Sequence, residues 1–199
     1  MNFRAAFAVA LLAALPATLP AQAAPRRAGG FSLAAGVGAG STSFSCDACV
    51  SQRDDGVGAV LRLGVNASSH LTLAAEASGW RADYDALRGT GKARVGLAQL
   101  VLQWYPSASA GAFVKAGGGV AAIRDELTLN DVGSVTVSTR NPAFVVGAGW
   151  EVGLGRHWAV VPFADLNVVS KGDQTVNDAE TGERLGATLL HAGVAIRVR

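Results

Sequence analysis

The dominant feature of this sequence is a strict alternation of apolar residues with polar or small ones, repeated about eight times along the chain. In one such segment Leu100, Leu102 and Trp104 alternate with Gln99 and Gln103. Because successive side chains of a strand point to opposite faces, a period of two predicts β-strands, whereas a helix would repeat near 3.6 residues. We predict strands near 31–42, 56–66, 71–81, 93–105, 113–123, 143–153, 158–169 and 186–198.

The connections between these strands alternate between long and short. The short ones cover 67–70, 106–111 and 154–157, and the long ones cover 43–55, 82–92, 124–142 and 170–185. Tight turns at one end and longer loops at the other are typical of a chain that meanders through an outer membrane. An even number of strands also returns both chain ends to the side of the tight turns. The pattern therefore predicts an all-β fold, an eight-stranded antiparallel up-and-down transmembrane β-barrel.

The two faces of the predicted sheet differ in polarity, since one is almost entirely aliphatic or aromatic. The other face carries Arg62, Glu76, Gln99, Gln103, Lys115, Glu151, Asp165, Asn167, His191 and Arg197. In a soluble, lipocalin-like barrel the polar face would contact water and the apolar face would line a ligand cavity. In a membrane barrel the arrangement is reversed, with polar side chains inside and apolar ones against lipid. Alternation alone does not choose between the two.

Two observations favour the membrane barrel. The polar face is rich in glycine and alanine, as the crowded interior of an eight-stranded barrel requires. Trp104, Tyr105 and Trp158 lie beside the short turns, where an aromatic girdle is expected. The composition agrees: apolar residues make up 50% of the sequence and charged residues 16%. The chain after residue 23 nevertheless holds no apolar run of the roughly 20 residues that a spanning helix needs.

Residues 1–23 have the features of a secretory signal peptide. Arg4 is followed by an unbroken apolar run over 5–15, and Ala21-Gln22-Ala23 fits a small-x-small cleavage site. We therefore expect export, followed by one outer-membrane β-barrel domain over 24–199. Without Arg4 the count of Lys and Arg falls from 17 to 16, against 15 Asp and Glu. Such a balanced chain is not expected to bind nucleic acid.

On this interpretation the barrel interior contains as many cations as anions. Buried charges must be paired, because each unpaired one costs several kcal/mol. Arg62 and Glu76 flank the short turn at 67–70 on adjacent strands, so we expect a direct ion pair between them. The whole predicted network, with a hydrogen-bonding histidine, comprises Arg62, Glu76, Lys115, Glu151, Asp165, His191 and Arg197. Since eight strands leave an interior filled by side chains, we interpret this network as a salt-bridged plug.

The segment Cys46-Asp47-Ala48-Cys49 suggests redox or metal chemistry at first sight. It has no second cysteine pair or nearby histidine to complete a zinc site, and no helix that would activate a thiol. In an exported chain the simpler prediction is a disulfide between Cys46 and Cys49 that shapes a loop tip. The glycine clusters likewise lack the helix that a phosphate loop needs. We expect no catalytic, metal-binding or cofactor-binding residues and no cofactor.

Three segments of the chain resemble a known family. They are Gln103-Trp104-Tyr105-Pro106-Ser107, Phe113-Val114-Lys115-Ala116-Gly117-Gly118-Gly119-Val120 and Val152-Gly153-Leu154-Gly155-Arg156-His157-Trp158, which leads to Pro162-Phe163. They are similar to the outer-membrane β-barrel domain proteins of Gram-negative bacteria, small barrels of the OmpA/OmpX type. Some members also carry Cys-x-x-Cys in the first long loop. The resemblance implies a place in the bacterial outer membrane, and because most members have no assigned activity it transfers no catalytic residue.

We expect a structural or surface-interaction barrel that acts through its four long loops and is not an enzyme. Those loops hold most of the remaining charges and lean acidic, which favours divalent cations that bridge to lipopolysaccharide, or an extracellular protein. The expected partners are therefore outer-membrane lipid, lipopolysaccharide and such a protein, and we expect a monomer. Three alternatives stay open: a transporter or porin-like barrel for a small apolar solute, suggested by Pro162 within a strand, a lipid-modifying enzyme, and a soluble periplasmic barrel.

Overall fold

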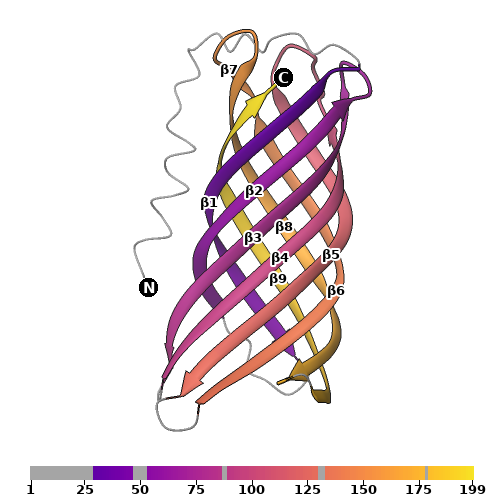
Figure 1. Ribbon diagram of the computed structural model, residues 1–199. Coiled ribbons are helices and arrows are strands. Elements are labelled where there is room, and N and C mark those ends of the chain that lie inside the picture. The colour runs from indigo at the N-terminus through magenta and orange to yellow at the C-terminus, as the bar shows by residue number, and fades with distance from the viewer. Residues whose placement is uncertain (1–28, 47–52, 87–88, 130–132, 178) are drawn as a thin grey trace.

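Each segment with a period of two forms part of a β-strand (Figure 1). The computed structural model describes residues 29–46, 53–86, 89–129, 133–177 and 179–199. The strands are β1 (Phe31–Cys46), β2 (Arg53–Asn66), β3 (Leu71–Ala86), β4 (Gly89–Trp104), β5 (Ala112–Leu129), β6 (Gly133–Trp150), β7 (Val152–Gly153), β8 (Trp158–Val176) and β9 (Ala179–Val198). In these residues no helix is long and apolar enough to cross a membrane. The predicted signal peptide over 1–23 lies outside them.

The strands pair with their neighbours in antiparallel fashion until the sheet closes on itself. β1 pairs with β9, and β6 pairs with β8. β7 is a two-residue continuation of β6 beyond Glu151 and also pairs with β8. Since β6 and β7 occupy one position in the wall, the predicted eight-stranded antiparallel barrel is confirmed.

One end of the barrel carries the three turns that were predicted as short connections. The turn at 67–70 joins β2 to β3, the turn at 105–111 joins β4 to β5, and the turn at 154–157 joins β7 to β8. The start of β1 and the end of β9 lie at the same end, at the top of Figure 1. We name this the turn end and the opposite end, where the strands extend beyond the apolar side chains, the outer end, because outer-membrane barrels project farther from the bilayer on the outside.

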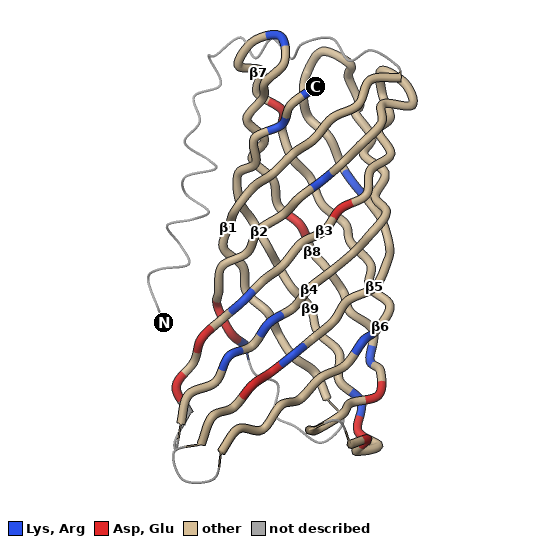
Figure 2. The backbone as a smooth tube through the Cα atoms, in the orientation of Figure 1, with Lys and Arg blue, Asp and Glu red and all other residues tan. Residues whose placement is uncertain are grey.

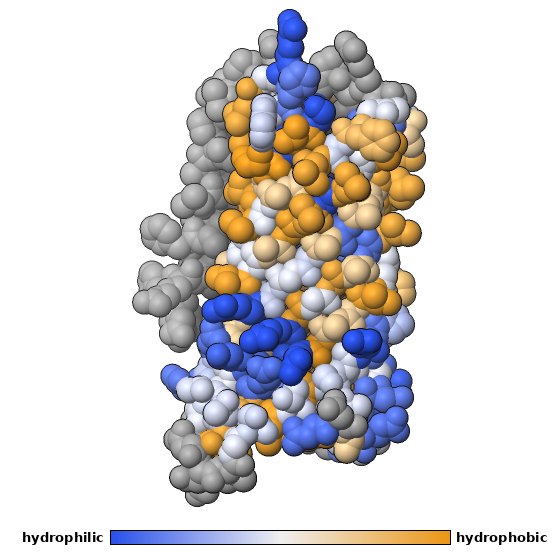
Figure 3. All heavy atoms as spheres, viewed as in Figure 1, coloured by the Kyte–Doolittle hydropathy of each residue, from blue (hydrophilic) through white to orange (hydrophobic). Residues whose placement is uncertain are grey.

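Outward-facing apolar side chains form a band next to the turn end (Figure 3). On β3 the band runs from Leu71 to Gly79, close to the roughly 9–11 residues that a tilted strand needs to cross a bilayer. The exposed tryptophans at its turn-end edge are Trp104, Trp150 and Trp158. The prediction that Tyr105 joins this girdle is wrong. Trp104 faces outward, so the next residue points inward, and Tyr105 is fully buried.

The strands continue well past the apolar band at the outer end. Apart from β7 they are 14 to 20 residues long. The prediction of four long loops is therefore wrong in extent, because most of those residues belong to the wall. The physical reason is the surrounding medium. An outward position in water accepts any polar residue, so the apolar alternation stops at the edge of the band while the backbone ladder continues.

The interior of the outer half is an apolar core, which the sequence reasoning did not foresee. Trp80 is 2% exposed, packs edge-on against Phe44 with ring centroids 6.4 Å apart, and donates from Nε1 to the Gly40 carbonyl at 3.2 Å. The buried members are Trp80, Ala82, Ala93, Val95, Leu97, Ala121, Ile123, Ala143, Val169, Leu185, Ala187 and Leu189. We name this group the outer core. Its wall faces water, so apolar side chains gain by turning inward.

Candidate functional site

The seven residues predicted to form the luminal network all point inward and are buried. Charged residues are sparse along the middle of the barrel and crowd toward the outer end (Figure 2). The luminal charges fall into two groups at different heights. The middle network comprises Arg62, Glu76, Lys115 and Asp165. The turn-end network comprises Tyr105, Glu151, Arg197 and Arg199.

The middle network starts from a cross-strand pair. Arg62 on β2 lies directly opposite Glu76 on β3, and its Nε donates to Glu76 Oε2 at 2.6 Å. Lys115 Nζ, from β5, donates to both carboxylate oxygens of Glu76 at 2.7 Å. The same ammonium lies 2.9 Å from Asp165 Oδ2 on β8. Two cations and two carboxylates alternate, so the network is neutral and ties together four strands.

A glycine on β6 allows the last of these contacts. Lys115 lies opposite Gly147, and Gly147 lies opposite Asp165. A Cβ atom at position 147 would overlap Asp165 Oδ1 and would lie 3.1 Å from Lys115 Cε. The glycine therefore leaves the space in which the ammonium and the carboxylate meet across an intervening strand.

The turn-end network is centred on Glu151, the residue between β6 and β7. Tyr105 Oη donates to Glu151 Oε1 at 2.6 Å, and both Arg197 and Arg199 form ion pairs with this carboxylate. Arg197 also donates to Tyr105 Oη and to Ser32 Oγ, each at 2.7 Å. Sequence reasoning found Glu151 and Arg197 but missed Tyr105 and Arg199. For Tyr105 a signal existed, because its neighbour Trp104 faces outward.

His191 lies beside the middle network as a packing residue. It is directly opposite Asp165 in the ladder, and its ring packs edge-on against Phe163 with centroids 5.3 Å apart. The hydrogen bond expected for this histidine is absent at Nε2, which has no partner within the described part of the chain.

The structure describes only one of the two cysteines. Cys46 ends β1 and packs, half-buried, against the outer core. Cys49 lies outside the described residues, and the disulfide between the two stays a prediction.

In the outer half, beyond the apolar band, Tyr84 and Asp125 face inward and form a hydrogen-bonded pair. Tyr84 Oη lies 2.8 and 3.0 Å from the two carboxylate oxygens of Asp125 and donates to them. Burial raises the pKa of Asp125 above its ordinary value, although the hydrogen bond from Tyr84 lowers it, and nearby Asp54 raises it further. Burial and the neighbouring carboxylate also raise the pKa of Tyr84, so the phenol keeps its proton.

A row of arginines lies on the outer wall where the apolar band ends. Arg81 on β3 lies directly opposite Arg94 on β4, which lies directly opposite Arg124 on β5. All three are exposed. We name them the arginine row. The row was not predicted from the sequence. It could have been found by continuing the alternation by one more step, because Arg81 follows Gly79 and Arg94 precedes Gly96 on the same outward face.

Comparisons with known proteins support this architecture. The family described as outer membrane protein beta-barrel domain matches residues 7–197. Among solved structures the barrel is similar to Ail, the attachment invasion locus protein of Yersinia pestis, with a TM-score of 0.54 and 10% identity over 85% of this chain and 99% of that one. Neisserial surface protein A has a TM-score of 0.52 and 15% identity over 87% and 99% of the two chains.

A third similar structure is the outer membrane protein OprG from Pseudomonas aeruginosa. Its TM-score is 0.50, with 12% identity over 86% of this chain and 97% of that one. At such identities the likeness to solved structures shows the fold alone. No curated protein matches the chain.

Proposed function

The chain belongs to the family of outer membrane proteins that carry a β-barrel domain, and from this premise we propose that it is a closed barrel with an interaction surface at the outer face of the cell. Its place is the outer membrane, which excludes the soluble periplasmic barrel. In the proposed role the lumen stays shut, no reaction is catalysed, and the outer extensions of the strands contact the partner.

The observation that carries this proposal is the filling of the lumen along its length. The turn-end network closes one end, with the Glu151 side chain 0% exposed. The middle network follows, with the Lys115 ammonium between two carboxylates. The outer core fills the rest around Trp80. An ion that moved along the axis would have to separate buried ion pairs and then cross an apolar core, and both steps are costly.

The outer extensions supply a rigid surface for a partner. Because β3 to β6 remain paired far beyond the band, their outward side chains project from a hydrogen-bonded wall and not from free loops. Ail offers a parallel: its structure in complex with the heparin analogue sucrose octasulfate has a TM-score of 0.52 and 11% identity to this chain. We therefore choose immobilised heparin and a layer of cultured epithelial cells as probes.

The test shortens the outer hairpins and leaves the membrane-spanning part unchanged. In one variant an Asn-Gly turn replaces residues 84–91, so that the hairpin closes on the pair Asp83–Lys92. In the other it replaces residues 127–135 and closes on the pair Glu126–Thr136. We expect cells that display the intact chain to bind a probe and the shortened variants to lose most of that binding. The matched control is S107A/S109A, which alters exposed residues of a turn at the opposite end.

Conductance measurements complete this test. We expect the purified intact chain to open no channel in a planar bilayer in which a wide porin conducts. Channels from the intact chain, or shortened variants that bind both probes as well as the intact chain, would contradict the proposal.

A second candidate function, passage of a small apolar solute through the wall, is favoured by an interruption between β6 and β8. Pairing runs to Ser138–Thr175 and resumes only at Ala143–Val169. Pro142 lies in this gap and has no N–H to donate. Side chains hold the gap closed: Thr139 donates to the Asp173 carbonyl at 2.8 Å and Asn141 to the Leu185 carbonyl at 2.9 Å. Ala143, Val169 and Leu185 belong to the outer core directly behind.

Pro162, the residue that suggested a gap from sequence, lies elsewhere. It is opposite Val194 in the regular β8–β9 ladder and falls where β8 changes partner from β6 to β7. The test of the second candidate therefore targets Ser138 and Thr175, whose hydroxyls lie 2.9 Å apart. If solute passes here, a disulfide in S138C/T175C should stop uptake of a fluorescent alkyl probe into vesicles, and reduction should restore it. Equal uptake of the probe with and without the disulfide would contradict this candidate function.

A further inference from the structure

The arginine row brings three like charges together on the outer wall. Arg81, Arg94 and Arg124 face outward at directly opposite positions of three adjacent strands. Adjacent strands are about 4.8 Å apart, so the three guanidinium groups project from a segment only about 10 Å wide. Like charges at opposite positions of a sheet destabilise it. An external anion that binds all three would remove that cost.

The neighbouring carboxylates are too few to balance the cations. Arg81 pairs with Asp83 at 3.2 Å. Glu126 is shared, at 3.0 Å from Arg124 and 3.7 Å from Arg94. The next outward position of β4 adds another cation, Lys92, opposite both carboxylates. At these described positions of β3 to β5, four cations against two carboxylates leave an excess of two positive charges. The three arginine side chains are 52 to 67% exposed, so an anion can reach them.

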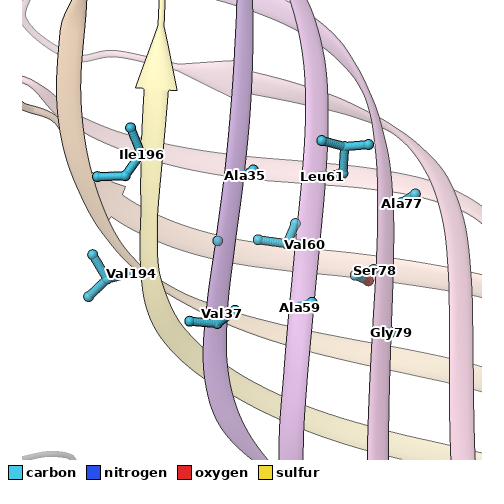
Figure 4. A pocket seen from close by; sticks show the side chains of 11 residues that line it. Ala35, Val37, Ala59, Val60, Leu61, Ala77, Ser78, Gly79, Val194 and Ile196 are labelled. Carbon is cyan, nitrogen blue, oxygen red and sulfur yellow. The ribbon is translucent and has the colours of Figure 1, made fainter.

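An apolar groove leads from the arginine row into the membrane band. Its outer part, about 800 Å³ in volume, lies over β1 to β4 and ends on Arg81 and Arg94. A second hollow of about 600 Å³ continues it toward the turn end, and both parts share Val37, Ala59 and Gly79 as lining residues. Figure 4 shows this second hollow, where small side chains lie between the larger Val194, Ile196 and Leu61.

Two glycines open the groove beside the arginines. Gly79 on β3 lies directly opposite Gly96 on β4, and each is two residues from an arginine of the row. A Cβ atom at either position would meet nothing within 4 Å. The glycines therefore leave a hollow on the face that contacts lipid, and the wall does not need them for close packing of the backbone.

We propose that the arginine row and the groove form one binding site for the phosphorylated, acylated glycolipid of the outer leaflet, the lipid A part of lipopolysaccharide. The phosphates lie on the guanidinium groups, whose planar forks match phosphate oxygens. One acyl chain lies in the groove past Gly79 and Gly96. The level fits this ligand, because the row is the first polar tier beyond the band at the outer end.

The same charges argue against a second copy of the chain as the occupant. A two-fold axis along the membrane normal would place the arginine row of one copy against that of the other. A free phosphate would use the row but would leave the groove without a role. An anionic lipid satisfies both parts. The site depends only on the membrane location, so it stands or falls separately from the proposed closed-barrel function.

The test measures binding of purified diphosphoryl, six-chain lipid A to the full chain in detergent micelles by native mass spectrometry. In R81Q/R94Q/R124Q we expect binding at least tenfold weaker. The matched control R53Q/K171Q/R184Q removes three other exposed outward cations, on β2, β8 and β9, and should change binding less than threefold. Equal loss in both variants would reveal unspecific charge attraction and overturn the site.

The groove is tested by a variant that fills it. G79L/G96L places two leucines into open space, so the barrel should fold and lipid A should bind at least tenfold more weakly. The matched control A148L/A164L likewise places two leucines at a directly opposite, exposed pair on β6 and β8. Undiminished binding in G79L/G96L would overturn the site. So would full displacement of lipid A by millimolar inorganic phosphate, or a dimer of the chain that only the groove variant abolishes.

Discussion

The membrane-spanning half and the outer half of this barrel are built from the same strands with opposite polarity. In the spanning half Leu73 faces outward and Glu76 faces inward. In the outer half of the same strand Arg81 faces outward and Trp80 faces inward. The period of two is the same in both halves of the strand. Only the medium around the strand differs. Hydrocarbon outside favours charges in the lumen, and water outside favours an apolar lumen.

This difference shows that the choice between a membrane barrel and a soluble barrel has to be made locally. The spanning half has polar side chains inside, as in a membrane barrel. The outer half has apolar side chains inside, as in a soluble barrel. Each half should therefore lose stability for its own reason, and substitutions at matched positions can separate the two.

The largest effect is expected from Lys115→Met in the middle network. The substitution leaves Glu76 and Asp165 buried without their shared cation, and breaking such a network costs about 3–5 kcal/mol. Unfolding by urea in detergent micelles, followed by the mobility of unboiled samples on a gel, measures this loss. The control is Lys92→Met on the outer wall, an exposed cation opposite Asp83 and Glu126, because exposed charges contribute about 1 kcal/mol or less. Equal losses would contradict the contrast between the halves.

Trp80→Ala should destabilise the outer half by about 3 kcal/mol, because it leaves a cavity in the outer core. Amide hydrogen exchange should quicken along the outer parts of β3 and β4 and should remain slow around Glu151. Trp104→Ala serves as the comparison, since that side chain faces lipid and its removal leaves no internal cavity. If exchange around Glu151 quickens as much as that of the outer strands, the two halves do not unfold separately.

Tyr105→Phe should cost about 2 kcal/mol, because its hydroxyl bonds to two charged groups, Glu151 and Arg197, and such hydrogen bonds are worth roughly 1.5–3 kcal/mol. Tyr84→Phe, which removes a hydroxyl from a more hydrated carboxylate, should cost less. The same urea titration ranks the two variants. The reverse order would mean that the lumen is wetter at the turn end than the burial of Tyr105 indicates.

The smallest effect concerns pH at the outer end. Burial raises the pKa of Asp125, so in the window between its ordinary and raised values the folded chain binds more protons than the unfolded one. Stability of the outer half is therefore greatest below that window and falls as pH rises through the folded pKa. Amide exchange of the outer parts of β4 and β5, corrected for intrinsic rates, should show this trend. Asp125→Asn should abolish it, and a trend that persists in this variant has another origin.

Much of the spanning half could be predicted from the sequence, because hydrocarbon imposes one strict condition on every second residue. That condition placed Arg62, Glu76, Lys115 and Asp165 on the inner face, and the short turn between β2 and β3 brought the first two together. The contact of Lys115 with Asp165 could not be predicted in this way, because the two residues are not on adjacent strands. Strand β6 lies between them, so the contact follows only from the complete order of strands in the sheet.

The outer half escaped prediction because water imposes no such condition on outward positions. Residues 82–92 look like a polar loop until the ladder that pairs Asp83 with Lys92 is known. The arginine row depends on that ladder, because its members are far apart in sequence. Trp80 alone carried a hint, as a large aromatic residue one step before the first outward arginine.

The pairing of β1 with β9 has a consequence for how the chain is made. Ser32 and Arg197, 165 residues apart, meet across this seam, so the wall cannot close before the final strand arrives. A product truncated before β9 would keep two bare edges, whose unsatisfied amides and carbonyls hydrocarbon does not tolerate and other chains readily bind. We therefore expect an incomplete product to remain open along this seam and to be more susceptible to proteolysis than the closed barrel.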